Sequence, residues 1–155
     1  MTTAFDQLMQ GLTAKPAKPS VPKTIPIVDL DLPLLDFQID AIIHAMRDLN
    51  AHPYAYVALD MGLGKTPVGI CIAASLVQAG HRNVAIVVPP SLRMTWVREL
   101  RKFASWLSVS VIKGNKPEPG EVLGDQDILI IGDSSLSGYA DFLTGKVGAL
   151  IVDEA

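Results

Sequence analysis

A glycine-rich segment, ALDMGLGKT at residues 58–66, contains the residue types that bind a phosphate group. Gly62 and Gly64 can adopt backbone conformations that other residues avoid, so successive N–H groups can point at one anion. Lys65 adds a cation able to reach the outer phosphates of a nucleotide, and Thr66 adds a hydroxyl able to ligate Mg²⁺. A helix that begins here would add its positive end. The segment therefore predicts a site for a triphosphate with Mg²⁺.

This segment departs at one position from the phosphate-loop pattern GxxxxGK[ST], because Leu59 stands where the first glycine belongs. The string DMGLGKT resembles motif I of the superfamily 2 helicase-like ATPases, in particular the sucrose-nonfermenting (Snf) type of double-stranded DNA translocase and chromatin remodeller. The resemblance implies ATP and Mg²⁺ as cofactors. The implied nucleotide-binding residues are Met61, Gly62, Leu63, Gly64, Lys65 and Thr66.

Upstream of the loop, LLDFQIDAI resembles the adenine-recognising Q motif of the same superfamily. Gln38 is the residue carried over. A side-chain amide offers both a donor and an acceptor, which matches the N6 and N7 edge of adenine. The alternative is a surface glutamine on an amphipathic helix.

At the other end of the chain, an apolar run at residues 147–152 leads into Asp153 and Glu154. The string VDEA resembles motif II, DEAH, without its final histidine. In that motif the aspartate holds Mg²⁺, and the glutamate orients and deprotonates the attacking water. The resemblance therefore implies Thr66 and Asp153 as metal ligands, and Lys65, Asp153 and Glu154 as catalytic residues.

Charge is distributed unevenly along the chain. Residues 81–116 carry seven basic and one acidic side chain, a net +6, although the whole chain is at −3. A basic segment of this kind is a candidate surface for nucleic-acid phosphates, and a solvated helix face is the alternative.

Within this basic segment, VVPPSLRMTWVREL resembles motif Ia of the same family. We interpret Trp96 as a core anchor rather than a base-stacking platform, because Leu92, Leu100 and Phe103 share its helical spacing. We expect Ser91 to cap this helix. The candidate DNA contacts, the first three by resemblance and the last three from the basic cluster, are Pro90, Ser91, Arg93, Arg98, Arg101 and Lys102.

Alternating strands and helices must position these residues. Apolar runs predict strands at residues 54–59, 83–88, 109–112, 128–131 and 147–152, and helical periodicity predicts helices at 37–49, 68–79, 92–103 and 139–143. The first helix should bury one face. That face comprises Phe37, Ala41, Ile42, Ala45, Met46 and Leu49.

The expected fold class is α/β, a RecA-like P-loop NTPase lobe with a mostly parallel sheet and helices on both faces, incomplete at the C-terminus. Residues 1–26, rich in proline and lysine, are expected to form a mobile leader, and residues 27–155 the truncated N-terminal lobe. The resemblance also implies that a strand following motif II would lie between the motif I and motif II strands. Its absence predicts an open slot between residues 54–59 and 147–152.

Composition excludes several classes of protein. With 49% hydrophobic residues the chain can bury a core, and its single Cys71 excludes a disulfide framework within the chain. No apolar run approaches the ~20 residues needed to cross a bilayer. We expect a soluble, intracellular, cytoplasmic protein.

The function that best fits is the N-terminal ATP-binding lobe of an ATP-dependent DNA translocase, with double-stranded DNA and a second RecA-like lobe or C-terminal complement as partners. Whether the chain alone is an enzyme stays open, because a second lobe would supply the arginine fingers. The alternatives are a different phosphate-loop ATPase, such as a recombinase or packaging motor, and a non-enzymatic lobe that binds DNA or protein as a regulator.

Overall fold

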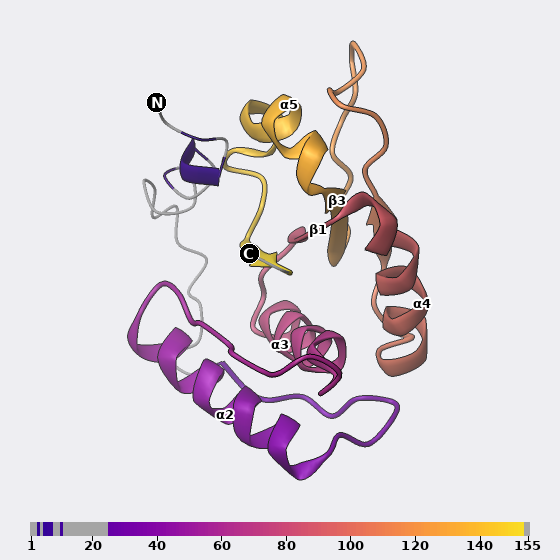
Figure 1. Cartoon of the computed structure of the whole chain (residues 1–155). Helices are drawn as coiled ribbons and strands as arrows, with labels where there is room; N and C mark the ends of the chain where they lie inside the picture. Colours follow the sequence, from indigo (N-terminus) through magenta and orange to yellow (C-terminus); the bar gives the residue numbers. More distant parts are fainter. Residues whose placement is uncertain (1–2, 4, 8–9, 11–24, 154–155) are drawn as a thin grey trace.

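The computed structural model of the 155-residue chain describes Thr3, residues 5–7, Gln10 and residues 25–153. The predictions for residues 11–24, Glu154 and Ala155 lie outside this part. The elements run in the order α2 (Asp36–Ala51), α3 (Lys65–Gln78), β1 (Val84–Val88), η1 (Pro90–Leu92), α4 (Arg93–Phe103), β2 (Val109–Val111), β3 (Ile128–Gly132), α5 (Asp133–Leu143) and β4 (Ala149–Val152) (Figure 1).

The four strands form one parallel sheet in the order β2-β3-β1-β4. β1 lies in the middle and pairs with β3 on one side and β4 on the other. Every residue of β1 and β3 is buried, as expected for parallel strands covered on both faces. The RecA-like α/β class is therefore confirmed, with β4 at one edge of the sheet.

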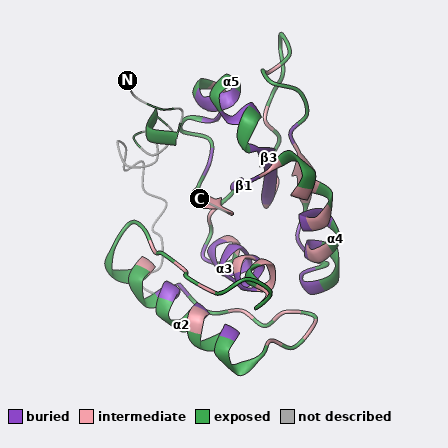
Figure 2. Ribbon diagram, in the orientation of Figure 1, coloured by how far each residue is buried: buried purple, intermediate pink, exposed green. Residues whose placement is uncertain are grey.

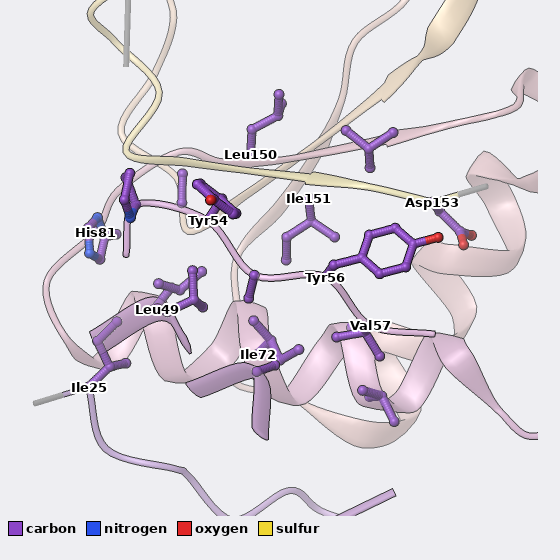
Figure 3. Close-up of a pocket in the computed structure, with 18 of the residues that line it drawn as sticks. Ile25, Leu49, Tyr54, Tyr56, Val57, Ile72, His81, Leu150, Ile151 and Asp153 are labelled. Carbon is purple, nitrogen blue, oxygen red and sulfur yellow. The ribbon is translucent and has the colours of Figure 1, made fainter. Parts of the chain in front are cut away.

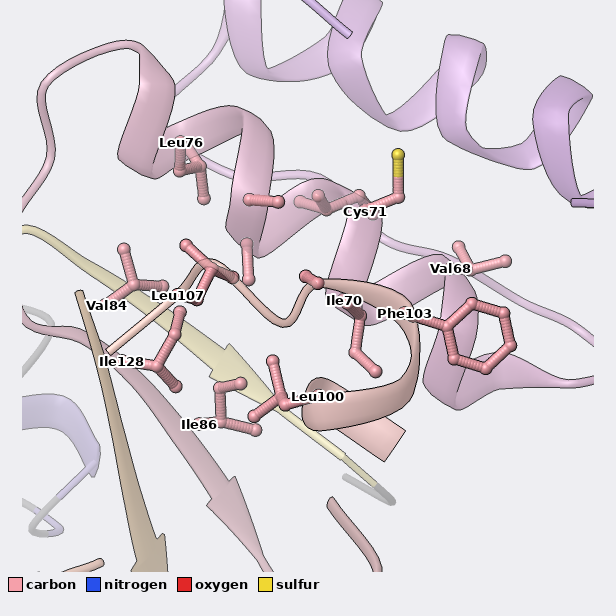
Figure 4. Packing of buried hydrophobic residues seen from close by; sticks show 14 of the residues in the cluster. Val68, Ile70, Cys71, Leu76, Val84, Ile86, Leu100, Phe103, Leu107 and Ile128 are labelled. Carbon is pink, nitrogen blue, oxygen red and sulfur yellow. The ribbon is translucent and has the colours of Figure 1, made fainter. Parts of the chain in front are cut away.

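Helices cover both faces of this sheet. Alternate side chains such as Ile86 and Ile130 face α3 and α4, whereas Val87 and Leu129 face α5. α2 packs on the outer side of α3 (Figure 1). The larger apolar cluster, between the sheet, α3 and α4, is seen in Figure 4, and the burial colouring of Figure 2 places α3 among the most deeply buried elements.

The end of α3 shows how the sequence fixes a boundary. Gly80, with φ of 98°, donates its N–H to the Val77 carbonyl at 2.9 Å, and His81 donates to the Leu76 carbonyl at 3.0 Å. This pair of bonds is a Schellman motif, in which glycine accepts the left-handed conformation without a Cβ penalty. The predicted end of this helix at residue 79 agrees with the structure, in which Ala79 is the C-cap.

The strand predicted at residues 54–59 is wrong as a strand. The segment is extended but has no ladder partner among the described residues, and Tyr54 and Tyr56 are 67% and 82% exposed. An apolar run becomes a strand only when a neighbour satisfies its N–H and C=O groups. This segment and β4 line opposite sides of a cavity and do not pair with each other.

Three smaller expectations also need correction. Ser91 does not cap α4, because it lies inside the short η1 turn and Leu92 occupies the cap position. Phe37 is 39% exposed, and Gln38 takes a buried place on α2 instead. The last helix starts at Asp133 rather than Tyr139, directly from the end of β3.

Candidate functional site: a phosphate loop facing a strand-end aspartate

The loop before α3 has the backbone shape that an anion cradle requires. Gly62 and Gly64 have φ angles of 82° and 74°, in the left-handed region open to glycine. Gly64 is the N-cap of α3, and no side chain caps that end. The first N–H groups of a helix have no partner within the helix, so they are available to a ligand at this position.

Lys65 and Thr66 occupy the first turn of α3. The first turn contains no acidic residue that would compete for an anion, and Lys65 is exposed. Pro67 follows them inside the same turn, where its missing N–H removes no intrahelical bond. The helix thus begins three residues before the predicted Val68, and both candidate residues are held by it rather than by the loop.

Gln38 ties α2 to the loop. Its side chain is 6% exposed; the amide Oε1 accepts from the Leu35 N–H at 3.0 Å, and Nε2 donates to the carbonyls of Leu63 at 3.1 Å and Gly64 at 3.4 Å. A Cβ placed on Gly64 would lie 2.5 Å from Nε2, so this close approach requires glycine. Gln38 therefore holds the loop against the start of α2.

Asp153 follows the carboxyl end of β4. Its backbone N–H donates to the Val87 carbonyl at 2.9 Å, which extends the pairing between β4 and β1 by one residue. Its side-chain Oδ2 accepts a hydrogen bond from Trp96 Nε1 at 2.9 Å. Glu154, its predicted catalytic neighbour, lies outside the described residues.

Lys65 and Asp153 line one cavity of about 620 Å³, which we call the edge cavity. It extends along β4, between that strand and residues 53–57, with Asp153 at its charged end (Figure 3). Its walls beyond the charged end are mostly apolar. They include Leu49, Val57, Ile72, Leu76, Ala149 and Ile151. The cavity occupies the position where the sequence predicted an open slot.

The residues at this end fit ATP with Mg²⁺. Mg²⁺ in nucleotide sites takes one or two carboxylates, a hydroxyl and phosphate oxygens. Asp153 offers a carboxylate with Oδ2 held by an indole, and Thr66 offers a hydroxyl in the first turn of α3, next to Lys65, which lines the cavity. Within the part of the chain that the structure describes, no group of three or more His, Cys, Asp or Glu side chains forms an alternative metal site.

The candidate DNA contacts divide into two groups. Arg98, Arg101 and Lys102 are exposed on α4, on the side away from its buried Trp96 and Leu100. Their charges have no acidic partner among the described salt bridges. The predicted cluster of exposed cations on this helix is therefore present.

Other cations of the basic segment are already engaged. Arg93 donates to the backbone carbonyls of Pro90 and Ile112, both at 3.3 Å, and so connects η1 to the end of β2. Arg82 pairs with Asp127 at 2.6 Å and with Asp125 at 3.5 Å. Ser91 and Pro90 are exposed beside Arg93. The net charge of +6 therefore overstates the number of cations available to a ligand.

Sequence reasoning missed the part that Trp96 plays in this site. Trp96 is 2% exposed, which agrees with the prediction of a core anchor, but its indole N–H reaches the motif II aspartate. The available signal was Gly69, one helical turn after Lys65, since a glycine inside a buried helix indicates close packing by a large neighbour.

A parallel sheet, a glycine loop leading into α3 and an aspartate at the end of a neighbouring strand together define a RecA-like lobe of the P-loop NTPases. Among solved structures, the chain is similar to the SWI2/SNF2 ATPase core of Sulfolobus solfataricus in complex with dsDNA. The TM-score is 0.64 at 24% identity, over 83% of this chain and 27% of that one. This likeness establishes the fold.

The sequence comparisons identify the family. The SNF2-related domain matches residues 43–155, so the chain belongs to this family of Snf2-type helicase-like ATPase domains. It is also 35% and 34% identical to the DNA annealing helicase and endonuclease ZRANB3 of Mus musculus and Bos taurus, in each case over 130 residues and 79% of this chain. The chain spans 12% of the length of these relatives. The hypothesis of an unrelated phosphate-loop ATPase is therefore wrong.

No helix in the described part of the chain is long and apolar enough to span a membrane.

Proposed function

We propose that this chain is the N-terminal ATP-binding lobe of an ATP-dependent DNA translocase or helicase. The observation that carries the proposal is the position of Lys65 and Asp153, which lie far apart in the sequence and line the same cavity. A phosphate loop facing a carboxylate is the arrangement that binds a nucleotide with its metal ion. The family match supports the same conclusion.

Each residue of the site has a proposed role. The backbone of residues 61–64 binds the β- and γ-phosphates, and Lys65 neutralises their charge. Thr66 and Asp153 hold Mg²⁺, which would stabilise the charge that develops on the transferred phosphoryl group. Glu154 would activate the attacking water.

Adenine recognition by Gln38 is also proposed, and it requires the side-chain amide to change its hydrogen-bond partners. Both ends of its amide are used by Leu35 and the loop carbonyls. Contact with the N6 and N7 edge of adenine therefore requires that ATP binding redirect the amide, which would release the loop from α2. Gln38→Ala should weaken nucleotide binding through either role. Binding of GTP separates them, since only adenine recognition would favour ATP over GTP.

Hydrolysis would require a second RecA-like lobe or another C-terminal complement. The observation in favour is that β4 is an edge strand of the described sheet, and its side away from β1 faces the edge cavity, which leaves room for a C-terminal complement. Loss of an arginine finger alone costs roughly 10³- to 10⁵-fold in related enzymes. We therefore propose that the isolated chain binds Mg²⁺-ATP weakly and turns it over negligibly. A regulator that only binds DNA or protein is the remaining alternative.

Isothermal titration with Mg²⁺-ATP tests the nucleotide site. Lys65→Ala should abolish measurable binding, because Lys65 is the only lysine or arginine among the described residues that line the cavity. Lys116→Ala, which removes the same charge from an exposed loop, should leave binding unchanged. Equal binding by wild type and Lys65→Ala, or motor-like turnover by the isolated chain, would overturn the proposal.

DNA binding, supported by the exposed cations of α4 and by the relatives named above, should be weak, insensitive to sequence and steeply salt-dependent. Arg98→Glu with Arg101→Glu should remove most of it and lower the salt slope by about 2, since each phosphate contact contributes about 1. Arg47→Glu with Lys146→Glu makes the same change in net charge away from α4. Equal losses in the two double variants would show that net charge alone matters.

We also propose an intracellular location. Burial raises the pKa of the Cys71 thiol to about 11, so this cysteine is an inert core residue of the kind that needs no oxidising compartment.

A further inference from the structure

Trp96 connects two parts of the candidate site that are far apart in the sequence. It lies on α4, is 2% exposed, and donates its indole N–H to Asp153 Oδ2 at 2.9 Å across a separation of 57 residues. Among the described residues, this is the only hydrogen bond to the side-chain oxygens of Asp153. Its geometry is that of a good N–H···O hydrogen bond.

The same ring packs against the helix that carries the phosphate-loop lysine. A Cβ placed on Gly69 would lie 2.8 Å from Trp96 Cη2 and within 3.7 Å of two further ring atoms. Gly69 stands one turn after Lys65 on α3, and residues four apart share a helix face. Lys65, Gly69, Trp96 and Asp153 all line the edge cavity. The indole therefore fills the space between the lysine's helix and the aspartate.

The chemistry of the indole suits a supporting role. Trp offers a donor and no acceptor, so it can hold a carboxylate oxygen without competing for a cation. With Oδ2 held, Oδ1 is left to a metal ion or its water. Carboxylates that ligate metals are commonly oriented by such hydrogen bonds, and loss of the partner typically weakens metal binding by about 10- to 100-fold.

We propose that Trp96 is a positioning residue for Asp153: its N–H fixes the carboxylate toward Lys65 and Thr66, and Gly69 is required because any side chain there would displace the ring. The proposal rests on the function proposed above, in which Asp153 binds the Mg²⁺ of ATP. A buried Trp needs a partner for its N–H in any case, so a purely structural role is the competing explanation.

An isosteric replacement separates the two explanations. In a Trp106→Phe chain Trp96 is the sole tryptophan, and the exposed Trp106 can be removed without disturbing the core. Biosynthetic replacement of Trp96 by its benzothiophene analogue then keeps the ring's size and removes only the N–H. Binding of a fluorescent N-methylanthraniloyl ADP is followed by anisotropy, first in EDTA and then as Mg²⁺ is added.

The proposal expects the Mg²⁺ midpoint to rise about 10- to 100-fold in the analogue-containing chain while affinity in EDTA is unchanged. The Trp106→Phe parent should match the wild type. An unchanged Mg²⁺ midpoint in a folded analogue-containing chain would overturn the positioning role and leave the proposed function intact. If the wild type itself shows no Mg²⁺-dependent nucleotide binding, the proposed function fails, and the positioning role fails with it.

Gly69→Ala provides a second test, and its NMR readout requires no nucleotide. In the Trp106→Phe chain the single indole ¹H–¹⁵N resonance reports the bond to Asp153, and Asp153→Ala defines the resonance without it. Gly69→Ala should move this resonance toward the Asp153→Ala position and raise the Mg²⁺ midpoint in the same direction. A Gly69→Ala chain with the parent resonance and the parent Mg²⁺ midpoint would show that the close packing positions nothing.

Discussion

The two ends of the parallel sheet each carry an aspartate next to a strand, and the two aspartates have different surroundings. At the amino end, Asp127 accepts hydrogen bonds from the Ser108 N–H and hydroxyl at 2.9 and 2.8 Å and from Arg82 at 2.6 Å. At the carboxyl end, Asp153 accepts one side-chain bond, from Trp96. The first carboxylate accepts three hydrogen bonds and joins strands, whereas the second accepts one and keeps more capacity for a ligand.

The amino end is held by side chains from the residues that precede three strands. Arg82, Ser108 and Asp127 come just before β1, β2 and β3, and they meet in one network. Asn83 adds bonds to the backbones of Gln126 and Lys146. Residue type alone therefore does not separate a carboxylate that joins strands from one whose oxygens stay open to a ligand. Their hydrogen-bond partners do.

The largest expected effect is at Asn83. It is 9% exposed, it has φ of 52°, and its side chain bonds to two segments. Asn83→Ala should lower the unfolding free energy by about 3 kcal/mol, because two hydrogen bonds are lost and alanine tolerates this φ poorly. Urea denaturation measures it. Lys116→Ala in an exposed loop is the control, and a loss below about 1 kcal/mol at Asn83 would show that the amino end is not a structural anchor.

The next effect concerns the two aspartates, whose substitutions should rank in opposite order for stability and for Mg²⁺-dependent nucleotide binding. Asp127→Ala should cost about 2 kcal/mol of stability, because it removes three hydrogen bonds, two from Ser108 and one from Arg82, whereas Asp153→Ala should cost about 1 kcal/mol. Mg²⁺-dependent nucleotide binding should show the opposite order, with loss in Asp153→Ala only. The comparison between the ends would fail if Asp127→Ala abolished Mg²⁺ dependence as well.

The smallest effect is a pH dependence at the amino end. Partial burial raises the pKa of Asp127, but the hydrogen bonds from Ser108 and the charge and hydrogen bond of Arg82 outweigh it, so the pKa lies below its usual value. The stabilisation is therefore present above the ordinary carboxyl pKa of about 4 and is lost as the pH falls through the folded-state value. Asp127→Asn should flatten the stability profile below about pH 4. An unchanged profile would show that other carboxyls dominate acid unfolding.

The sequence predicted the two central strands and the glycine loop before α3 well, because both depend on local patterns. Unbroken apolar runs identified β1 and β3, and glycines with lysine and threonine identified the loop that begins α3. The prediction failed at residues 54–59. An apolar run indicates that a segment can be buried in a sheet, but it does not show that a partner strand is available. The prediction of Ser91 as a cap failed for a related reason. The short η1 turn, which begins at Pro90 and leads into α4, has no sequence signature distinct from that of a helix start.

The contacts of Gln38 and Trp96 could not have been derived from spacing. Gln38 meets the loop only because α2 packs on α3, and Trp96 meets Asp153 only because β4 pairs with β1. Both contacts join residues far apart in the chain. A single sequence gives the type of such residues, whereas the fold decides which of them meet.

The strand order β2-β3-β1-β4 has a consequence for synthesis on the ribosome. β1, the central strand, emerges before either of its neighbours, and its first partner begins at Ile128 and its second at Ala149. The apolar strand β1 therefore stays unpaired while most of the remaining chain is translated. Parallel pairings of such separation form slowly and leave nascent chains exposed to aggregation. Chaperone engagement should accordingly be greatest for ribosome-bound chains that have released Val88 but not yet Gly132.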